Sequence, residues 1–485
     1  MKIGIANTII SPDREDRKRP IQLGGFSPRE YCSGIHDDLF ARCVYFEGNK
    51  EDISTHIMFM VCDIIAIDKR IAKLVKEKIA RKIPILEQNI MISATHTHHG
   101  PDYKGNFKVG GGLSIIQGFL FPNPQTDLLV ELGKKMIKVG IKAYSNRERS
   151  ALGVKQIKIP ENRRVMINRR APFNPESADY PVTIIRINRI RNEDQQNIES
   201  QGEVQKNGEM IGCIVNYAIH GTVLPRYNTE ITADYVGYLI RRLEDEYPDL
   251  TGKFLYFNGP CGEINPLTSE LKQKMEKAGS LENLTNDDIY DQKGTWDDAK
   301  RIGNTIAEEV ISHLDNISCK EFANLTCKKK TVHIPIKDYT QAHDFGSVLN
   351  HISYQLKKNL FSFFARINLL KTSILLSTET IQKGFIEPPL QWFQIGYLMV
   401  FSVPGEYFLK LAKEVLEETS RKFPDKKGMI VELANDSVGY LYSLEAYIEG
   451  GYESSFSLTP LGGRYITLML KKGIRELKQA KTEKN

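Results

Sequence analysis

Short apolar runs alternate with longer amphipathic stretches along the first two thirds of the chain. Residues typical of β-strands cluster at 2–5, 41–47, 56–67, 89–95, 151–159, 182–188, 209–218 and 253–258. Between several of these runs, apolar residues recur at helical spacing, at 68–81, 125–145 and 234–246. Strands that alternate with helices are typical of α/β proteins. We therefore predict an α/β fold with a mixed or partly parallel β-sheet that is flanked by helices.

The pattern of the remaining chain predicts further helices at 296–314, 339–357, 367–382 and 407–422, and strands at 331–336, 391–402 and 428–433. The segments 189–207 and 279–295 are polar and rich in turn-forming residues, so we expect surface loops there. The sequence shows no internal repeat and no clear linker. We predict one large catalytic domain over 1–485, with small insertions at 266–297 and 338–385.

Composition narrows the class of protein. The formal charge of +6 is small for 485 residues, and the basic runs contain few aromatic residues, so we expect no nucleic-acid site. The most apolar stretch, 360–376, is interrupted by Arg366 and Lys371, so no stable membrane insertion is expected. The seven cysteines are scattered, and the first residues enter a strand without a signal peptide. These features predict a cytoplasmic protein with reduced thiols; the oligomeric state stays open.

Three histidines follow the apolar run at 89–95, in the sequence Thr95-His96-Thr97-His98-His99. Imidazoles at the end of a strand are suited to binding a metal or to transferring a proton. In an extended strand, His96 and His98 would project from the same face and converge. From this motif alone, a group of solvated histidines is an equally good interpretation.

Four other segments carry candidate chemistry. His220 ends an apolar run at 213–220, and a glycine-rich loop at 258–266 contains Asn265. Glu406 follows Pro404 and Gly405, and Tyr440 and Tyr452 lie in segments that contain glycines. Each has an ordinary structural explanation: a satisfied histidine, a turn, a glutamate that complements a helix dipole, or a packed tyrosine.

Taken in order, these segments resemble the neutral/alkaline (non-lysosomal) ceramidase family. The resemblance implies a catalytic Zn2+ whose ligands are His96, His220, Glu406 and Tyr440. Nitrogen and oxygen donors of this kind suit zinc, although iron and manganese accept them too. The segments that match the family lie at 34–42, 60–63, 93–98, 218–221, 233–238, 262–266, 404–406 and 435–452.

The resemblance also implies roles around the metal. His98 would carry a proton or stabilise the developing oxyanion, and Tyr452 would face the substrate. An arginine of an Asn-Arg motif approaches the substrate in the family. This chain has two such motifs, with Arg163 and Arg169, and we prefer Arg169 because proline residues follow it.

Three departures from the family concern the substrate. Asn265 stands where the ceramidases carry a serine proposed as catalytic; an asparagine cannot act as that nucleophile but can hydrogen-bond a carbonyl. We also expect the C-terminal β-sandwich of the larger ceramidases to be lacking. Finally, His99 replaces a small residue, which predicts a more polar mouth of the site.

These features lead to a zinc-dependent hydrolase that cleaves an amide or ester bond of a small polar substrate through a metal-activated water. One alternative is a ceramidase acting on N-acyl-sphingosine; the apolar run 111–121 would suit an acyl chain or form a buried loop. Another is a non-catalytic family member that binds metal or ligand. Activity that is sensitive to chelators would separate either enzyme from the binding protein.

Overall fold

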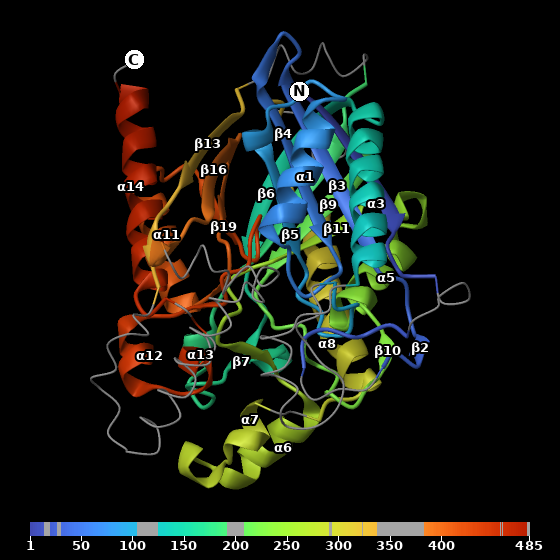
Figure 1. Cartoon of the computed structure of the whole chain (residues 1–485). Helices are drawn as coiled ribbons and strands as arrows, with labels where there is room; N and C mark the ends of the chain where they lie inside the picture. The colour runs from blue at the N-terminus through green and yellow to red at the C-terminus, as the bar shows by residue number, and fades with distance from the viewer. Residues whose placement is uncertain are drawn as a thin grey trace, which may run out of the picture.

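The computed structural model of the chain describes residues 1–13, 20–26, 31–103, 125–191, 208–290, 293–322, 324–336, 383–455, 457 and 459–482 (Figure 1). No helix within these ranges is long and apolar enough to cross a membrane. The expected helices 339–357 and 367–382 and the apolar run 111–121 lie outside the described residues. None of the seven cysteines, all of which are described, forms a disulfide.

An eight-stranded sheet forms the centre of the fold. Its two edge pairs, β11–β9 and β4–β5, are parallel, and every other pair is antiparallel. The expected mixed sheet is therefore confirmed. In spatial order the strands are β11 (Phe254–Asn258), β9 (Met210–Tyr217), β8 (Val182–Arg189), β6 (Glu148–Ile157), β1 (Lys2–Ile9), β3 (Phe40–Asn49), β4 (Asp52–Cys62) and β5 (Ile90–Ala94).

Four helices cover one face of this sheet. Alternate apolar residues of β1, β3, β4 and β5 pack on α1 (Lys69–Ala80) and α3 (Thr126–Ser145), which lie in front of the sheet in Figure 1. Those of β8, β9 and β11 pack on α5 (Tyr235–Glu246) and α8 (Trp296–Leu314). Periodic apolar residues predicted each of these helices to within two residues, because an amphipathic stripe marks the buried face.

The opposite face of the large sheet packs on a second sheet, with β13 (Thr326–Thr331), β16 (Pro389–Ile395), β17 (Leu398–Ser402) and β19 (Lys427–Val431) in that order. The rings of Phe59 and Phe393 meet at this interface, with centroids 4.9 Å apart. Helices α11 (Leu409–Lys422) and α14 (Gly462–Thr482) cover the outer face of the second sheet. The fold therefore has four layers, helix–sheet–sheet–helix (Figure 1).

The second sheet corrects one prediction. The segment 391–402 forms not one strand but two, β16 and β17, which pair antiparallel around a turn at Gly396. The φ of Gly396 is 56°, a conformation that glycine adopts without strain. The loop expected at 279–295 also contains a short helix, α7 (Asn286–Tyr290), and α6 (Ser269–Ala278) precedes it.

The two edges of the large sheet lie close together, since β11 contacts both β4 and β5. Five antiparallel steps separate β11 from β5, so the ladder alone would point their carboxyl ends in opposite directions. A twist of roughly 20–25° per strand adds up to roughly 140–175° over seven strand pairs. This is close to a half turn, so the carboxyl ends of β11 and β5 point in similar directions. An isolated parallel bridge between Thr97 and Gly221 joins the segments that follow β5 and β9. The histidines of both segments therefore meet at one edge.

Candidate metal centre

The segment after β5 turns sharply at His96. The strand ends at Ala94, and His96 has a φ of 68°, in the left-handed region that residues with a Cβ rarely adopt. The sequence predicted that His96 and His98 project from the same face of an extended strand. This prediction is wrong, because the chain turns at His96. The turn nevertheless brings Nε2 of His98 to 3.4 Å from Nε2 of His96. Strained backbone of this kind clusters at functional sites.

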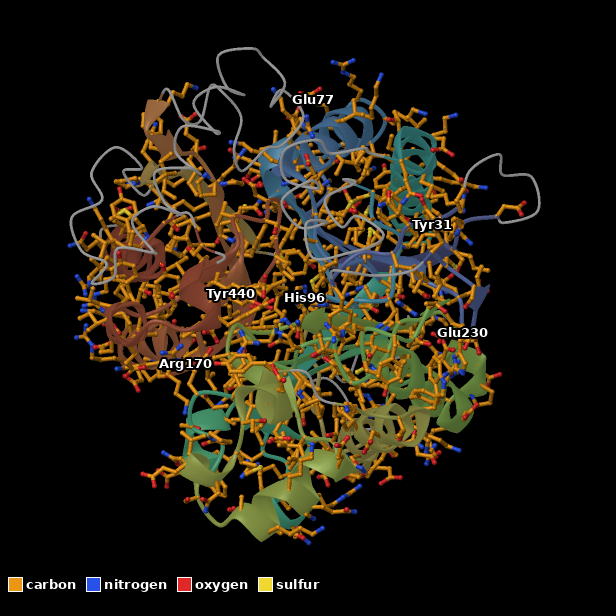
Figure 2. The ribbon with its side chains drawn as sticks, turned by 60° about the horizontal axis from the view of Figure 1, so that its bottom comes forward. Tyr31, Glu77, His96, Arg170, Glu230 and Tyr440 are labelled. Atoms are coloured by element: carbon orange, nitrogen blue, oxygen red, sulfur yellow. The ribbon has the colours of Figure 1, made fainter. Side chains whose placement is uncertain are left out.

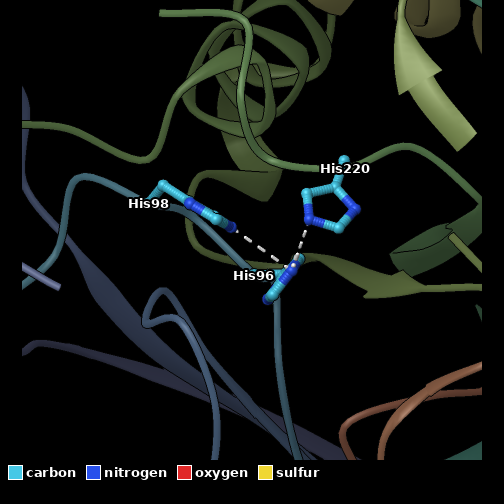
Figure 3. A group of neighbouring side chains, drawn as sticks. All are labelled: His96, His98 and His220. Atoms are coloured by element: carbon cyan, nitrogen blue, oxygen red, sulfur yellow. Dashed lines mark hydrogen bonds between the residues drawn. The ribbon is translucent and has the colours of Figure 1, made fainter. Parts of the chain in front are cut away.

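The third histidine comes from the segment after β9. Nε2 of His220 lies 3.0 Å from Nε2 of His96, and the three rings converge in Figure 3. Gly221 permits this approach, because a Cβ at that position would lie 2.3 Å from the carbonyl oxygen of His96. In the described ranges, His96, His98 and His220 are the one group of three or more histidine, cysteine or acidic side chains spaced to hold a metal ion.

Glu406 and Tyr440 reach the same place from segments that follow β17 and β19 of the second sheet. They are register partners in a two-residue parallel pair, β18 (Glu406–Tyr407) with β20 (Tyr440–Leu441). Oε2 of Glu406 lies 3.5 Å from Nε2 of His96 and 3.5 Å from Nε2 of His220. The ring of Tyr440 is nearly parallel to that of His220, with centroids 6.5 Å apart. In Figure 2, where the bottom of the molecule in Figure 1 comes forward, His96 and Tyr440 are labelled side by side near the middle of the view.

These donors fit a divalent metal. Two ligands at 2.0–2.1 Å from a tetrahedral zinc are roughly 3.3–3.4 Å apart, close to the 3.0–3.5 Å that separate the donor atoms of His96, His220 and Glu406. Nδ1 of His96 donates to the carbonyl of Ile65 (2.7 Å), and Nδ1 of His220 donates to that of Cys261 (3.2 Å). Nε2 of each ring thus presents its lone pair to the cluster, the usual arrangement for a ligand. Oε2 of Glu406 is buried and forms no hydrogen bond with any described residue.

The electrostatics of the cluster also favour a cation. Burial, together with His96 and Arg169, lowers the pKa of His220 well below its usual value, so this ring is neutral. Burial, together with Glu406, raises the pKa of Tyr440 well above its usual value. Burial opposes protonation of His96, but the contact with Glu406, the charge of Glu432 and the hydrogen bond to the Ile65 carbonyl together outweigh it and raise the His96 pKa. A divalent cation among these atoms would favour neutral imidazoles and a phenolate.

Arg169 lies beside this cluster, fixed on all sides. It is 4% exposed; its Nε donates to Glu453 (2.7 Å), its Nη1 to Asn265 (3.1 Å) and its Nη2 to the carbonyl of Gly262 (2.5 Å). Its guanidinium carbon also lies 5.4 Å from the ring centroid of Tyr440.

The other Asn-Arg motif is elsewhere. Arg163 pairs with Glu308 and Glu309 on α8 at the surface. Of the two arginines, the structure brings Arg169 to the site.

The remaining predicted residues occupy different positions. Tyr452 begins α13 (Tyr452–Ser455), with its ring 5.9 Å from that of Tyr440, and 45% of the residue is exposed. Asn265 uses both ends of its amide inside the protein, since Oδ1 accepts from Arg169 and Nδ2 donates to the carbonyl of Ile289 (2.9 Å). It therefore orients Arg169.

His99 corrects an expectation. It is fully buried, and its Nε2 lies 3.3 Å from the carbonyl oxygen of Pro225. It does not line the mouth of the site, because the turn at His96 directs it into the protein, so the inference of a more polar mouth is wrong.

Two residues of the surroundings were missed. Glu453 anchors Arg169 and follows Tyr452 directly, so its place in a candidate segment was the one available signal. Glu432 lies behind the cluster, where it accepts from the amides of Cys261 and Tyr407, and no motif in the sequence marks it.

The comparisons agree with this geometry. Residues 19–257, which include all three histidines of the cluster, match the family model described as neutral/alkaline non-lysosomal ceramidase, N-terminal. A neutral ceramidase from Pseudomonas aeruginosa has the same fold, with a TM-score of 0.69 and 16% identity over 99% of this chain and 74% of that one. A ceramidase complexed with C2 is similar at a TM-score of 0.69 and 15% identity, over 99% and 75% of the two chains.

No curated protein matches the sequence. At these identities the solved structures establish the fold, whereas the family model recognises the sequence itself. Residues 19–257 belong to the neutral/alkaline non-lysosomal ceramidase family, and the whole chain has the fold of the solved ceramidases.

Proposed function

We propose that the chain is a zinc-dependent hydrolase of N-acyl amides. The observation that carries the proposal is the convergence of His96, His220 and Glu406, whose donor atoms lie 3.0–3.5 Å apart, with Tyr440 paired in register to Glu406. These four residues would hold the metal. Zinc in such a site supplies Lewis acidity and lowers the pKa of water to about 7.

The protein's own groups would handle the proton and orient the substrate. His98 is 8% exposed, against 2% for His96 and His220, so it lies on the more open side of the cluster. Its Nε2 can take a proton from the nucleophile and return it to the leaving amine. Arg169 would keep the rings of Tyr440 and Tyr452 in place, and the exposed Tyr452 would hydrogen-bond the substrate.

The substrate class follows from the family and from the position of His99. Ceramidases act on an amide, and His99 is buried, so it gives no reason to prefer a polar substrate. N-acyl-sphingosine is therefore the first substrate to test, ahead of small polar amides. Since the proposed ligands come from segments that follow strands of both sheets, the two sheets would form one catalytic domain.

The test is hydrolysis of a panel by the zinc-loaded protein: N-acyl-sphingosines with short and long acyl chains, an N-acyl amino acid and an aryl ester. We expect release of the amine from at least one amide, abolished by a chelator and in Glu406→Ala. If the protein binds zinc and turns over no member of the panel, it is a binding protein. Activity that survives the chelator would remove the metal from the mechanism.

A further inference from the structure

A fully buried carboxylate lies directly behind the proposed ligands. Glu432 follows β19, is 0% exposed and accepts four hydrogen bonds. Its Oε2 accepts from the backbone amides of Cys261 (3.0 Å) and Tyr407 (2.9 Å). Its Oε1 accepts from Sγ of Cys261 (2.8 Å) and Nδ2 of Asn258 (3.3 Å). Both oxygens are therefore fully occupied by donors from two separate segments.

Both amides belong to residues that position a proposed ligand. The carbonyl of Cys261 accepts from Nδ1 of His220 and thereby fixes which nitrogen of that ring faces the cluster. Tyr407 follows Glu406 in β18, so its amide fixes the backbone that carries the Glu406 carboxylate. The carbonyl of Tyr407 also accepts from the amide of Gly262 (3.1 Å), which ties the two segments together.

We propose that Glu432 is a positioning residue of the metal centre: it holds the Cys261 and Tyr407 segments in register and so aligns His220 with Glu406. This role rests on the proposed function. Without an acceptor at this place, two buried N–H groups would lose their partners, and each segment would shift to find another. Contacts behind a ligand change metal affinity by 10- to 100-fold when they are removed.

Three substitutions separate the presence of an acceptor from its position. Glu432→Gln keeps one oxygen that can accept from both amides and replaces the other with an amide nitrogen. Glu432→Asp keeps both oxygens and shortens the reach by one methylene. Glu432→Met keeps the length and removes every acceptor. The control is Glu47→Met, because Glu47 is also a buried carboxylate. It accepts from Nε of Arg147 (2.6 Å) and pairs with His56 near the start of β4, whereas the cluster lies beyond the carboxyl end of β5.

The measurement is the Kd for Zn2+ by competition with a chromogenic chelator, together with the visible absorption of the Co2+ form. We expect Glu432→Met to weaken zinc binding about 10- to 100-fold and to change the Co2+ spectrum. Glu432→Gln should bind zinc more tightly than Glu432→Asp, and Glu47→Met should match the wild type. If Glu432→Met does not fold, the test rests on whether Glu432→Gln binds zinc more tightly than Glu432→Asp.

A zinc affinity equal to that of the wild type in all three Glu432 variants would overturn the positioning role alone. A loss of affinity in Glu47→Met as large as that in Glu432→Met would overturn it too. A wild-type protein that binds no zinc would overturn the metal centre, and this role with it.

Discussion

At the scale of single residues, the three clustered histidines differ in their surroundings. His96 and His220 each direct Nδ1 at a backbone carbonyl and are 2% exposed. His98 is more accessible, and its ring packs on that of Phe26, with centroids 4.8 Å apart. The first two therefore have the environment of metal ligands, whereas the third has that of a residue facing substrate.

This difference predicts the behaviour of His98→Ala. The variant should retain zinc but lose 10²- to 10⁴-fold in kcat, the usual contribution of a general acid–base group. His220→Ala, made alongside it, should lose the zinc. Metal content and steady-state kinetics of the two variants check the prediction. Loss of zinc from both would instead make His98 a ligand, in a site with three histidines.

Arg169 gives a second prediction. Replacing it with methionine leaves the carboxylate of Glu453 buried without its closest cation, and we expect a loss of about 3–5 kcal/mol in unfolding free energy. Arg170→Met is the control, because Arg170 also pairs with Glu453 but is more exposed. Its loss should be smaller. Urea unfolding of both variants measures the difference, and equal losses would contradict a special role for Arg169.

The sequence could reveal the proposed ligands but not the contacts that position them. His96, His98 and Glu406 follow apolar runs, a pattern visible without a structure. The left-handed turn at His96 was not predictable, since nothing in Thr95-His96-Thr97 favours it locally; contact with the segment of Gly221 imposes it. Glu432 is equally invisible, because its four donors lie far from it in sequence.

At the scale of elements, the contact between the segments after β5 and β9 assembles the cluster. The amide of His98 donates to the carbonyl of Gly221 (3.1 Å), next to the bridge with Thr97. Hydrophobic periodicity predicted the strands and most helices, because the residues on a buried face are apolar and recur at the spacing of the element. It could not predict that the two edges of the sheet meet, since this depends on twist summed over eight strands.

Gly221→Ala tests that contact. The added Cβ would lie 2.3 Å from the carbonyl oxygen of His96, so the two segments must separate. We expect zinc affinity to fall at least tenfold, as when contacts that orient ligands are lost. Gly100→Ala is the matched control, because its nearest neighbour would be an ordinary 3.5 Å away. Unchanged affinity in Gly221→Ala would show that the bridge does not set the ligand geometry.

At the scale of the whole molecule, a polar network joins the two sheets behind the site. Lys76 on α1 is buried and donates to Oδ1 of Asn435, which also accepts from the amide of Ile92 (3.1 Å). Nδ2 of Asn435 donates to Gln391 on β16 (2.6 Å). Asn435 begins the segment that leads to Tyr440, so this network connects packing of the layers to a proposed ligand.

Lys76 makes stability depend on pH. Burial, with the charge of Lys329, lowers its pKa from 10.5 to about 7. Between pH 7 and pH 10.5 the unfolded chain binds more protons than the folded chain, so this group makes the free energy of unfolding rise with pH. Below pH 7 Lys76 is charged in both states, and the cost of burying its charge is greatest. Lys76→Met should therefore be more stable than the wild type by roughly 1–3 kcal/mol at pH 6. The difference should reverse towards pH 10, where the charge penalty is nearly gone and the variant still lacks the hydrogen bond to Asn435.

Urea unfolding at pH 6, 8 and 10 checks this, with Lys73→Met as the control, because the Lys73 side chain is 74% exposed on the same helix. A gain that does not change with pH would contradict the titration of Lys76.

The central claim is a zinc site built from both sheets, and elemental analysis tests it most directly. The wild type should be measured beside His96→Ala, from the large sheet, Glu406→Ala, from the second, and His333→Ala, whose exposed ring pairs with Glu387. The account predicts about one zinc per chain in the wild type and in His333→Ala, and none in the other two. A wild type without metal, or zinc that survives either ligand substitution, would contradict it.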